Sequence, residues 1–389
     1  KVSKENHPDL QEVVDSGQIP NLVSMLRETS WPKLQLEAAW TLTNVASGNA
    51  EQTEAVVAAG AVAVFVDLLS SKDPHVRSQV AWGLGNIAGD STRLRDLVLE
   101  AGAMAPTLAL LSSAEDTATI VWALSNYSRG RPRPSFEAVE PALPYLVQLL
   151  HATTKEDVII DACWALAFIS DCDNEHICKV IRAGVCPVLV PHLCHPNQTV
   201  QTPALRAMAN LVTGPDEDTD KVLNANFMPA LKMLVLHPRS GMRKEACWAL
   251  SNILAGTRSQ IQQVIESGVA PHLIELIKTD AYSEVRKEAA WCFGNAITGG
   301  GSSDVQVEYL VDQGCVEAML DFLQMRLRVE ERWQIMALEM FQSLLERDAV
   351  RCSEGRPRYI EEVRKYGGQE VMKGLSTSPH DSVKASALR

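Results

Sequence analysis

A tryptophan and an asparagine four residues apart recur along the chain, and this pair offers a specific binding chemistry. In Trp82-Gly-Leu-Gly-Asn86 the indole face can attract a cation, with a gain of roughly 0.5–2 kcal/mol per contact. The asparagine carboxamide carries both a donor and an acceptor, so it can pair with the backbone of an extended peptide whatever that peptide's sequence. Four residues make about one helical turn, which places both side chains on one helix face. The same pair stands at Trp40/Asn44, Trp122/Asn126, Trp248/Asn252 and Trp291/Asn295.

The tryptophan positions follow a fixed period. Trp164, Trp333 and Arg206, which precedes Asn210, continue the register, so the anchors fall at 40, 82, 122, 164, 206, 248, 291 and 333. Neighbouring anchors are 42, 40, 42, 42, 42, 43 and 42 residues apart. A period of this size is typical of a helical solenoid, in which each repeat contacts only its neighbours. We interpret the aligned helix faces, named here the Trp–Asn row, as the functional surface.

Each repeat is predicted to contain three helices. In the second unit these cover residues 51–59, 62–69 and 73–88, with a glycine corner at Gly60 and an Asp73-Pro74 start to the third helix. Corners are expected again at Gly102, Gly184, Gly268, Gly314, Glu140-Pro141 and Asn226. Three helices in about 42 residues favour an all-α armadillo-repeat fold, a right-handed superhelical solenoid, over the two-helix HEAT and TPR patterns.

The unbroken period predicts one armadillo-repeat domain over residues 1–389. Residues 1–16 are interpreted as a truncated first repeat, 17–340 as regular repeats and 341–389 as degenerate C-terminal repeats. Terminal repeats are commonly atypical because one of their sides faces water.

The composition limits the class of partner. The chain has a net charge of −12 and 46% hydrophobic residues. An acidic balance disfavours nucleic acid and anionic membranes as partners and favours basic ones. No apolar run is long enough to span a membrane and no signal peptide is recognised. Nine cysteines without a CxxC pair favour free thiols in a reducing compartment.

The Trp–Asn row does not fit a purely structural role. The apolar stripe of the second unit's third helix is already made by Val76, Val80, Leu84 and Ile87. Trp82 and Asn86 lie off that stripe, and an asparagine buried in every repeat would need a partner every time. Slots between neighbouring indoles instead suit the aliphatic stem of a lysine or arginine, and each repeat would meet roughly two to three residues of an extended peptide.

Carboxylates at a fixed offset from the anchors predict selectivity for cations. Acidic residues stand three positions before five of the anchors: Glu37, Asp161, Glu245, Glu288 and Glu330. Asp90, eight residues after Trp82, is expected just past a helix C-terminus, where the helix dipole also favours a cation.

Breaks divide the row into two blocks. Phe168 and Ala337 replace the asparagine after Trp164 and Trp333, and Arg206 replaces a tryptophan. Arg206 would repel a ligand cation. The intact pairs therefore form one block from Trp40 to Asn126 and another from Asn210 to Asn295, which a peptide with two basic clusters could bridge with a gain in effective concentration.

These residues resemble importin-α, the armadillo adaptor that carries nuclear localisation signals. The resemblance rests on the Trp–Asn array, on residues 46–53 (ASGNAEQT) and 82–90 (WGLGNIAGD), and on the place of Arg206, and it covers almost the whole chain. It implies a major site made of Trp40, Asn44, Gly48, Thr53, Gln79, Trp82, Asn86, Asp90, Trp122 and Asn126. It implies a minor site made of Arg206, Asn210, Val212, Thr213, Glu245, Trp248, Asn252, Glu288, Trp291 and Asn295.

The resemblance also implies partners. The expected function is binding of mono- and bipartite basic nuclear localisation signals and linkage of this cargo to importin-β, with shuttling between cytoplasm and nucleus. The family binds importin-β through a basic N-terminal segment that also folds back as an autoinhibitor, and nothing in this sequence matches it. An export receptor is expected at the C-terminal repeats. No nucleic acid, membrane or cofactor is expected to bind.

Other classes of function fit less well. Gly83-x-Gly85-x-x-Ala88-Gly89 resembles a dinucleotide fingerprint but is expected late in a helix, so no enzyme is predicted. The cysteines and histidines from Cys172 to His195 lack zinc-ligand spacing, and no metal site is expected. The alternative that remains is an armadillo scaffold of the junction or signalling type, which binds other extended peptides.

Overall fold

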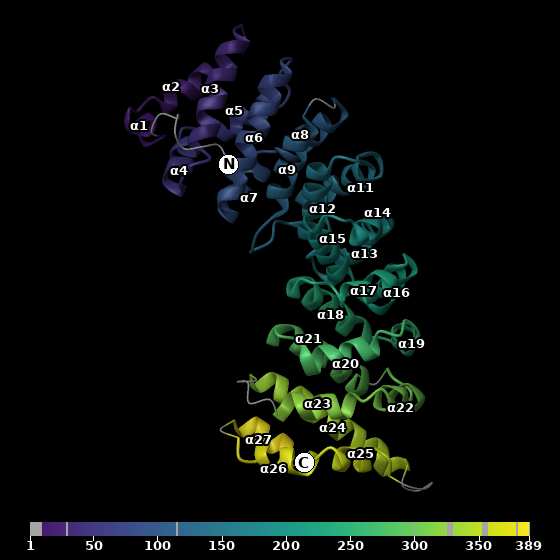
Figure 1. Ribbon diagram of the computed structural model, residues 1–389. Coiled ribbons are helices and arrows are strands. Elements are labelled where there is room, and N and C mark those ends of the chain that lie inside the picture. Colours follow the sequence, from purple (N-terminus) through teal and green to yellow (C-terminus); the bar gives the residue numbers. More distant parts are fainter. Residues whose placement is uncertain are drawn as a thin grey trace. The chain divides into compact units, whose positions relative to one another are not determined.

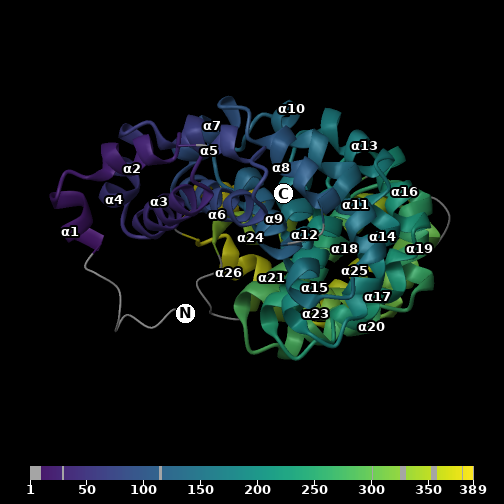
Figure 2. The same cartoon turned by 90° about the horizontal axis from the view of Figure 1, so that it is seen from above.

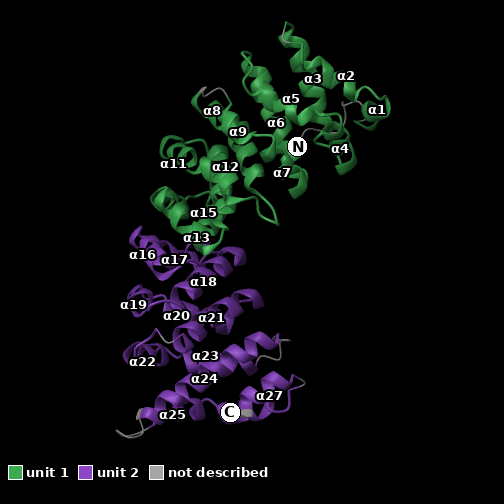
Figure 3. Ribbon diagram, turned by 180° about the vertical axis from the view of Figure 1, so that it is seen from behind, with its two compact units in different colours: residues 1–207 green, residues 208–389 purple. Residues whose placement is uncertain are grey.

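The computed structural model describes residues 10–28, 30–113, 116–299, 301–324, 330–351, 357–378 and 380–388. The expected truncated repeat over 1–16 and the expected C-terminal repeats over 341–389 lie partly outside these ranges. Helices and turns, without a strand, make up the secondary structure of the described residues. The chain divides into two compact units, residues 1–207 and 208–389 (Figure 3).

Unit 1 is a succession of three-helix groups. The first three groups are α1 (Leu10–Asp15), α2 (Ile19–Met25) and α3 (Pro32–Val45); α4 (Ala50–Ala58), α5 (Ala61–Leu68) and α6 (Pro74–Asp90); and α7 (Thr92–Glu100), α8 (Met104–Leu110) and α9 (Thr117–Ser128). The next are α10 (Phe136–Val139), α11 (Leu143–Ala152) and α12 (Glu156–Ser170); and α13 (Asn174–Arg182), α14 (Val185–Leu189) and α15 (Gln198–Leu211), the last of which crosses the unit boundary.

Unit 2 continues the same scheme. Its groups are α16 (Asp216–Asn224), α17 (Phe227–Leu234) and α18 (Ser240–Leu254); α19 (Arg258–Glu266), α20 (Ala270–Thr279) and α21 (Ser283–Thr298); α22 (Asp304–Asp312), α23 (Cys315–Gln324) and α24 (Glu331–Arg351); and α25 (Tyr359–Lys365), α26 (Gly368–Leu375) and α27 (Asp381–Leu388). The predicted three-helix armadillo repeat is thus confirmed.

Local sequence signals explain where the helices begin and turn. Gly60 has φ +81°, a left-handed conformation that glycine adopts without steric cost, and it joins α4 to α5. Asn226, with φ +68°, takes this role between α16 and α17, as expected for the residue type that best tolerates this region after glycine. Asp73 accepts the backbone N–H groups of His75 and Val76 and so starts α6.

The third helices of successive groups pack on one another and so position the Trp–Asn row. In unit 1, α3 packs on α6, α6 on α9 and α9 on α12 (Figure 1). Figure 2 shows α3 and α6 side by side in a second view. In unit 2, α18, α21 and α24 pack in the same order. The expected stripe of α6, made by Val76, Val80, Leu84 and Ile87, is fully buried, so one face of α6 lies in the core of its group.

No single helix among the described residues has the length and apolar character of a membrane span. The adjacent segments Asn174–Arg182 and Val185–Cys194, bent by 70°, meet that test only together.

Candidate functional site

Two indoles of the predicted major site are exposed on adjacent helices. Trp40 on α3 is 46% exposed and Trp82 on α6 is 39% exposed, although Leu42 of α3 and Leu84 of α6, two residues after each indole, are fully buried. An indole face left in water on a rigid helix can accept a lysine or arginine side chain without rearrangement of the core. Asn44 and Asn86 are partly buried one helical turn further along the same helices.

A glycine of α6 makes room for the next indole. A Cβ atom added at Gly85 would lie 2.4 Å from Cζ3 of Trp122, so only glycine lets the half-buried Trp122 ring of α9 settle on α6. Trp122 is thereby held against the helix that carries Trp82. Gly85 belongs to the motif at residues 82–90, but no local sequence signal indicates this packing role.

Two asparagines of the row use their carboxamides inside the fold. Asn86 Nδ2 donates to the carbonyl oxygen of Thr43 on α3 (3.1 Å), and in unit 2 Asn295 Nδ2 donates to that of Ser251 on α18 (2.9 Å). One N–H of each amide therefore joins neighbouring third helices, which leaves the second N–H and the carboxamide oxygen for a peptide. Asn126 is 4% exposed, and its Nδ2 has no hydrogen-bond partner among the described residues.

The remaining residues of the predicted major site differ in access. Gly48 is exposed and approaches Gln52 so closely that an added Cβ would lie 1.9 Å from Oε1. Thr53 is 1% exposed, and its hydroxyl donates to the carbonyl oxygen of Ala46 (3.2 Å), so its side chain cannot reach a peptide in this conformation. Gln79 is half-buried. Asp90 is exposed as the last residue of α6, where the helix carbonyl groups add partial negative charge.

The fourth third helix replaces the asparagine with an aromatic ring. Phe168 stacks on Trp164 within α12, with ring centroids 5.5 Å apart. This contact occupies an indole face that the other repeats leave beside an asparagine. Burial, with a further contribution from the neighbouring Asp157 carboxylate, raises the pKa of Asp161 to about 6. The acid at this anchor thus loses its charge in mildly acidic solution.

The predicted minor site begins on α15. Arg206 is exposed there, at the position that tryptophan holds elsewhere, while Asn210 and Val212 are 6% and 2% exposed. Thr213 is exposed, and its hydroxyl donates to the carbonyl oxygen of Asn210 (2.7 Å). Thr213 is therefore more accessible to a ligand than Asn210 and Val212.

The helices α18 and α21 carry the rest of the predicted minor site. Trp248, Glu245 and Asn252 on α18 are half-buried, and so are Trp291, Glu288 and Asn295 on α21. Burial raises the pKa of Glu288 above its ordinary value. A carboxylate that is partly desolvated in this way gains from a cation placed beside it.

The expected anchor at Trp333 is wrong. Trp333 is 2% exposed, whereas the row requires an indole on the surface. Trp82 is the ninth residue of α6 and Trp291 the ninth of α21, but Trp333 is the third residue of α24. The ninth residue of α24 is the exposed Glu339, so the period counted along the sequence runs out of phase with the helix here.

Further carboxylates at the −3 offset have different surroundings. Glu37 is exposed on α3. Glu330 pairs with Lys287 Nζ (3.3 Å) and Arg332 Nε (3.3 Å), two cations of the protein itself. In the described residues no group of three or more histidine, cysteine, aspartate or glutamate side chains is arranged to hold a metal ion.

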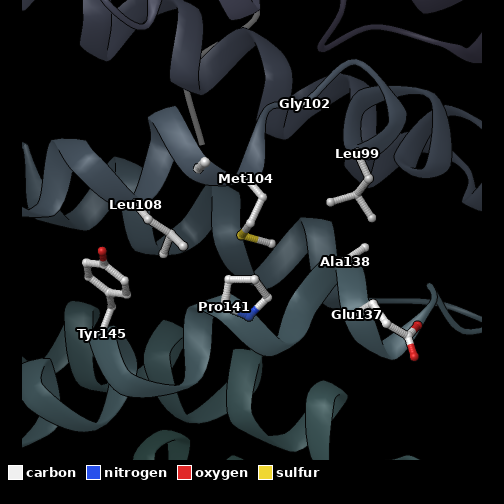
Figure 4. Close-up of a pocket in the computed structure, with 9 residues that line it drawn as sticks. Leu99, Gly102, Met104, Leu108, Glu137, Ala138, Pro141 and Tyr145 are labelled. Carbon is white, nitrogen blue, oxygen red and sulfur yellow. The ribbon is translucent and has the colours of Figure 1, made fainter.

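Unit 1 also has an apolar pocket of about 390 Å³ away from the Trp–Asn row. Figure 4 shows Tyr145 and Glu137 on opposite sides of Met104 and Pro141. Its lining side chains belong to the first and second helices of two successive groups and to the turn between α10 and α11. The pocket thus offers apolar contact and a single carboxylate, but no indole of the row.

Comparisons with known proteins place this geometry in a family. The model of the armadillo/beta-catenin-like repeat matches residues 49–89, 132–171, 173–213, 215–255 and 257–297. Importin subunit alpha-1a of Oryza sativa subsp. japonica is 46% identical over 221 residues, which cover 56% of this chain and 42% of that protein. Importin subunit alpha-B of Dictyostelium discoideum is 52% identical over 221 residues, 55% of this chain and 42% of that protein. The matched region thus spans less than half the length of these relatives.

A solved structure agrees with the fold. The crystal structure of an engineered protein is 31% identical, with a TM-score of 0.86 that covers 97% of this chain and 89% of that one. The armadillo-repeat family and its importin-α members are adaptors and scaffolds without catalysis, which agrees with the expectation that this chain is not an enzyme. The resemblance to importin-α is confirmed by these matches, and the chain belongs to the armadillo-repeat family.

Proposed function

We propose that this protein is a nuclear import adaptor whose Trp–Asn row binds lysine- and arginine-rich nuclear localisation signals. The observation that carries the proposal is the pair of exposed indoles, Trp40 and Trp82, on adjacent third helices, with the exposed Asp90 at the end of the second one. The names of the relatives support it, since they are importin subunits.

Different residues of the row bind the side chains and the backbone of the ligand. A ligand lysine lays its aliphatic stem between indoles, and its ammonium group reaches Asp90 at the negative end of α6. One N–H of Asn86 Nδ2 donates to the carbonyl oxygen of Thr43, so the second N–H and the carboxamide oxygen are left to pair with a backbone C=O and N–H of the ligand. The sequence-independent contact fixes the register of the peptide, and the indoles with Asp90 select cations.

The decisive experiment compares a fluorescent lysine-rich peptide with an acidic peptide of equal length by anisotropy. We expect the lysine-rich peptide alone to bind, with affinity that falls as salt rises. Asp90→Lys should abolish binding at the major site, while Asp67→Lys, a charge reversal at an exposed aspartate of α5, should change it less than twofold. Binding of the acidic peptide instead would support the scaffold alternative.

In the wider adaptor function, the residues of α18 and α21 form a minor site for the second cluster of a bipartite signal. Linkage to importin-β through an N-terminal segment, release by an export receptor at the C-terminal repeats and shuttling between cytoplasm and nucleus complete this function. It is tested with a two-cluster peptide titrated against Trp40→Ala/Trp82→Ala and against Trp248→Ala/Trp291→Ala. Each double variant should lose one of the two contributions to affinity, and equal binding to both variants and wild type would contradict the two-site arrangement.

A further inference from the structure

The slot beside Trp291 is filled by side chains of the protein itself. Trp333 of α24 meets Trp291 edge to face, with ring centroids 5.5 Å apart. Lys287 Nζ lies 5.7 Å and Arg332 Cζ 4.7 Å from the centroid of the Trp333 ring. Both distances fall within the range of a cation–π contact. An arrangement of cations on indole thus exists here without a ligand.

Acidic groups hold these two cations in place. Lys287 Nζ lies 2.8 Å from Glu284 and 3.3 Å from Glu330, and its side chain is 11% exposed. The hydrogen bond to Glu284 contributes most to a raised pKa of Lys287, so this lysine stays charged. Arg332 pairs with Glu330 but keeps a side chain that is 66% exposed. The lysine is therefore the inner occupant and the arginine the outer, more easily displaced one.

The position of Arg332 distinguishes this end from the rest of the row. The residue before each earlier anchor is apolar and fully buried: Ala39, Ala81, Val121, Cys163, Leu205, Cys247 and Ala290. At Trp333 the preceding residue is the exposed Arg332, because the indole, rather than its neighbour, has entered the core. The indole Nε1 of Trp333 is buried and has no hydrogen-bond partner among the described residues.

We propose that Lys287 and Arg332 close the Trp–Asn row of unit 2 at Trp291, as built-in occupants of a cation slot completed by Trp333. This inference rests on the proposed function and adds a limit to it. In unit 2 a basic ligand binds along the row as far as the slot of Trp291. A ligand cation placed beyond this slot must displace Arg332 and compete with it for Glu330. Removal of the two internal cations opens one more slot, with Glu284, Glu288 and Glu330 left to receive a ligand arginine.

The test uses Lys287→Met/Arg332→Ala and a control, Lys244→Met. Lys244 stands four residues before Trp248 as Lys287 stands before Trp291, and it pairs with the same Glu284 (3.8 Å). Anisotropy compares a peptide of one basic cluster with versions extended by two arginines at either end. We expect one extended version to bind the double variant about three- to tenfold more tightly than its parent peptide. Wild type and Lys244→Met should show less than a twofold gain.

A second readout separates this inference from the proposed function. The indole N–H resonance of Trp333, assigned with Trp333→Phe, is followed by NMR during titration with an amidated arginine dipeptide. It should shift in the double variant and stay unchanged in wild type, whether or not longer peptides bind. Equal gains for wild type and double variant, or an unmoved Trp333 resonance in both, would overturn the inference. Failure of the parent peptide to bind wild type would instead overturn the proposed function.

Discussion

Trp82 in unit 1 and Trp333 in unit 2 stand at the same phase of the sequence period but in opposite environments. Trp82 is 39% exposed and has a fully buried alanine before it, whereas Trp333 is 2% exposed and has an exposed arginine before it. The helices explain the difference. α18 and α21 begin 43 residues apart, but α24 begins 48 residues after α21, at Glu331. The indole falls early in α24, where it packs against Trp291 of α21 and is buried.

The comparison teaches that helix phase, rather than residue type, decides what an indole does. On the surface of α6 the ring can receive a cation from a ligand, while at the start of α24 it receives Lys287 and Arg332 from the protein. Unit 1 has a related break at Trp164, where Phe168 covers the ring instead. A tryptophan of the period thus offers a binding surface at Trp82, stacks on a phenylalanine at Trp164, and at Trp333 is buried and supports two cations of the protein.

The largest effect is expected from Trp333→Ala. Removal of a buried indole should lower the free energy of unfolding by about 3 kcal/mol, because it leaves a cavity between α21 and α24. Urea titration gives the total effect, and hydrogen exchange of α21 and α24 locates it. Trp82→Ala is the matched control and should cost less than half as much. Equal losses would break the distinction between the two indoles.

A smaller effect, on ligand affinity rather than on stability, is expected from Trp40→Ala/Trp82→Ala. Loss of two cation–π surfaces should weaken binding of a single-cluster basic peptide by about 2 kcal/mol, close to thirtyfold. Trp31→Ala, which removes an indole that is 67% exposed outside the row, should leave the affinity within twofold. Anisotropy at constant salt measures both, and equal losses in the two variants would argue against the row as the ligand surface.

Gly85→Ala tests the support of the row rather than its surface. The new Cβ would overlap the Trp122 ring, so α6 and α9 must shift, and we expect a destabilisation of about 1–2 kcal/mol. Gly241→Ala, on α18 where an added Cβ meets open space, should be neutral or stabilising. Thermal unfolding compares the two. A neutral Gly85→Ala would contradict the packing of Trp122 against α6.

The smallest effect is expected at Asp161 on α12, three residues before Trp164. Its pKa of about 6 in the folded state lies above the ordinary value of 3.8, so the folded state binds more protons between these values. Stability contributed by this group should therefore fall as pH rises from about 4 to 6 and stay low above that. Asp161→Asn should raise stability at pH 7.5 by about 1 kcal/mol, with solvent screening at this half-buried site taken into account.

Urea titrations of Asp161→Asn at pH 4 and pH 7.5 measure this difference. The exposed Asp67→Asn serves as the control and should show no such pH dependence. A stability difference between wild type and Asp161→Asn that stays constant across this range would show that folding does not raise the pKa of Asp161.

Much of the fold could be predicted from the sequence because its signals are local. The corners at Gly60 and Asn226 follow from the left-handed backbone that these residue types tolerate, and the start of α6 follows from Asp73 before Pro74. The apolar stripe of α6 followed from helical periodicity alone. The exposure of Trp40 and Trp82 could also be predicted, since both lie off such a stripe.

Contacts between helices could not be predicted in this way. Nothing local to Asn86 indicates that its amide donates to Thr43, 43 residues away, or that Gly85 accommodates Trp122. The arginine before Trp333 was a visible signal, because every earlier anchor follows an apolar residue. Its meaning depends on the starting point of α24, which the period of the tryptophans does not reveal.

The repeat, its three helices and the residue types on each third helix follow from local sequence, because propensity, capping and periodicity act within a few residues. Which of those side chains face solvent and which face a neighbour depends on how the helices pack. That choice depends on the rotation and offset of one helix against the next, which packing sets between residues about 40 positions apart. For this reason one period yields open indoles at Trp40 and Trp82 and a closed one at Trp333.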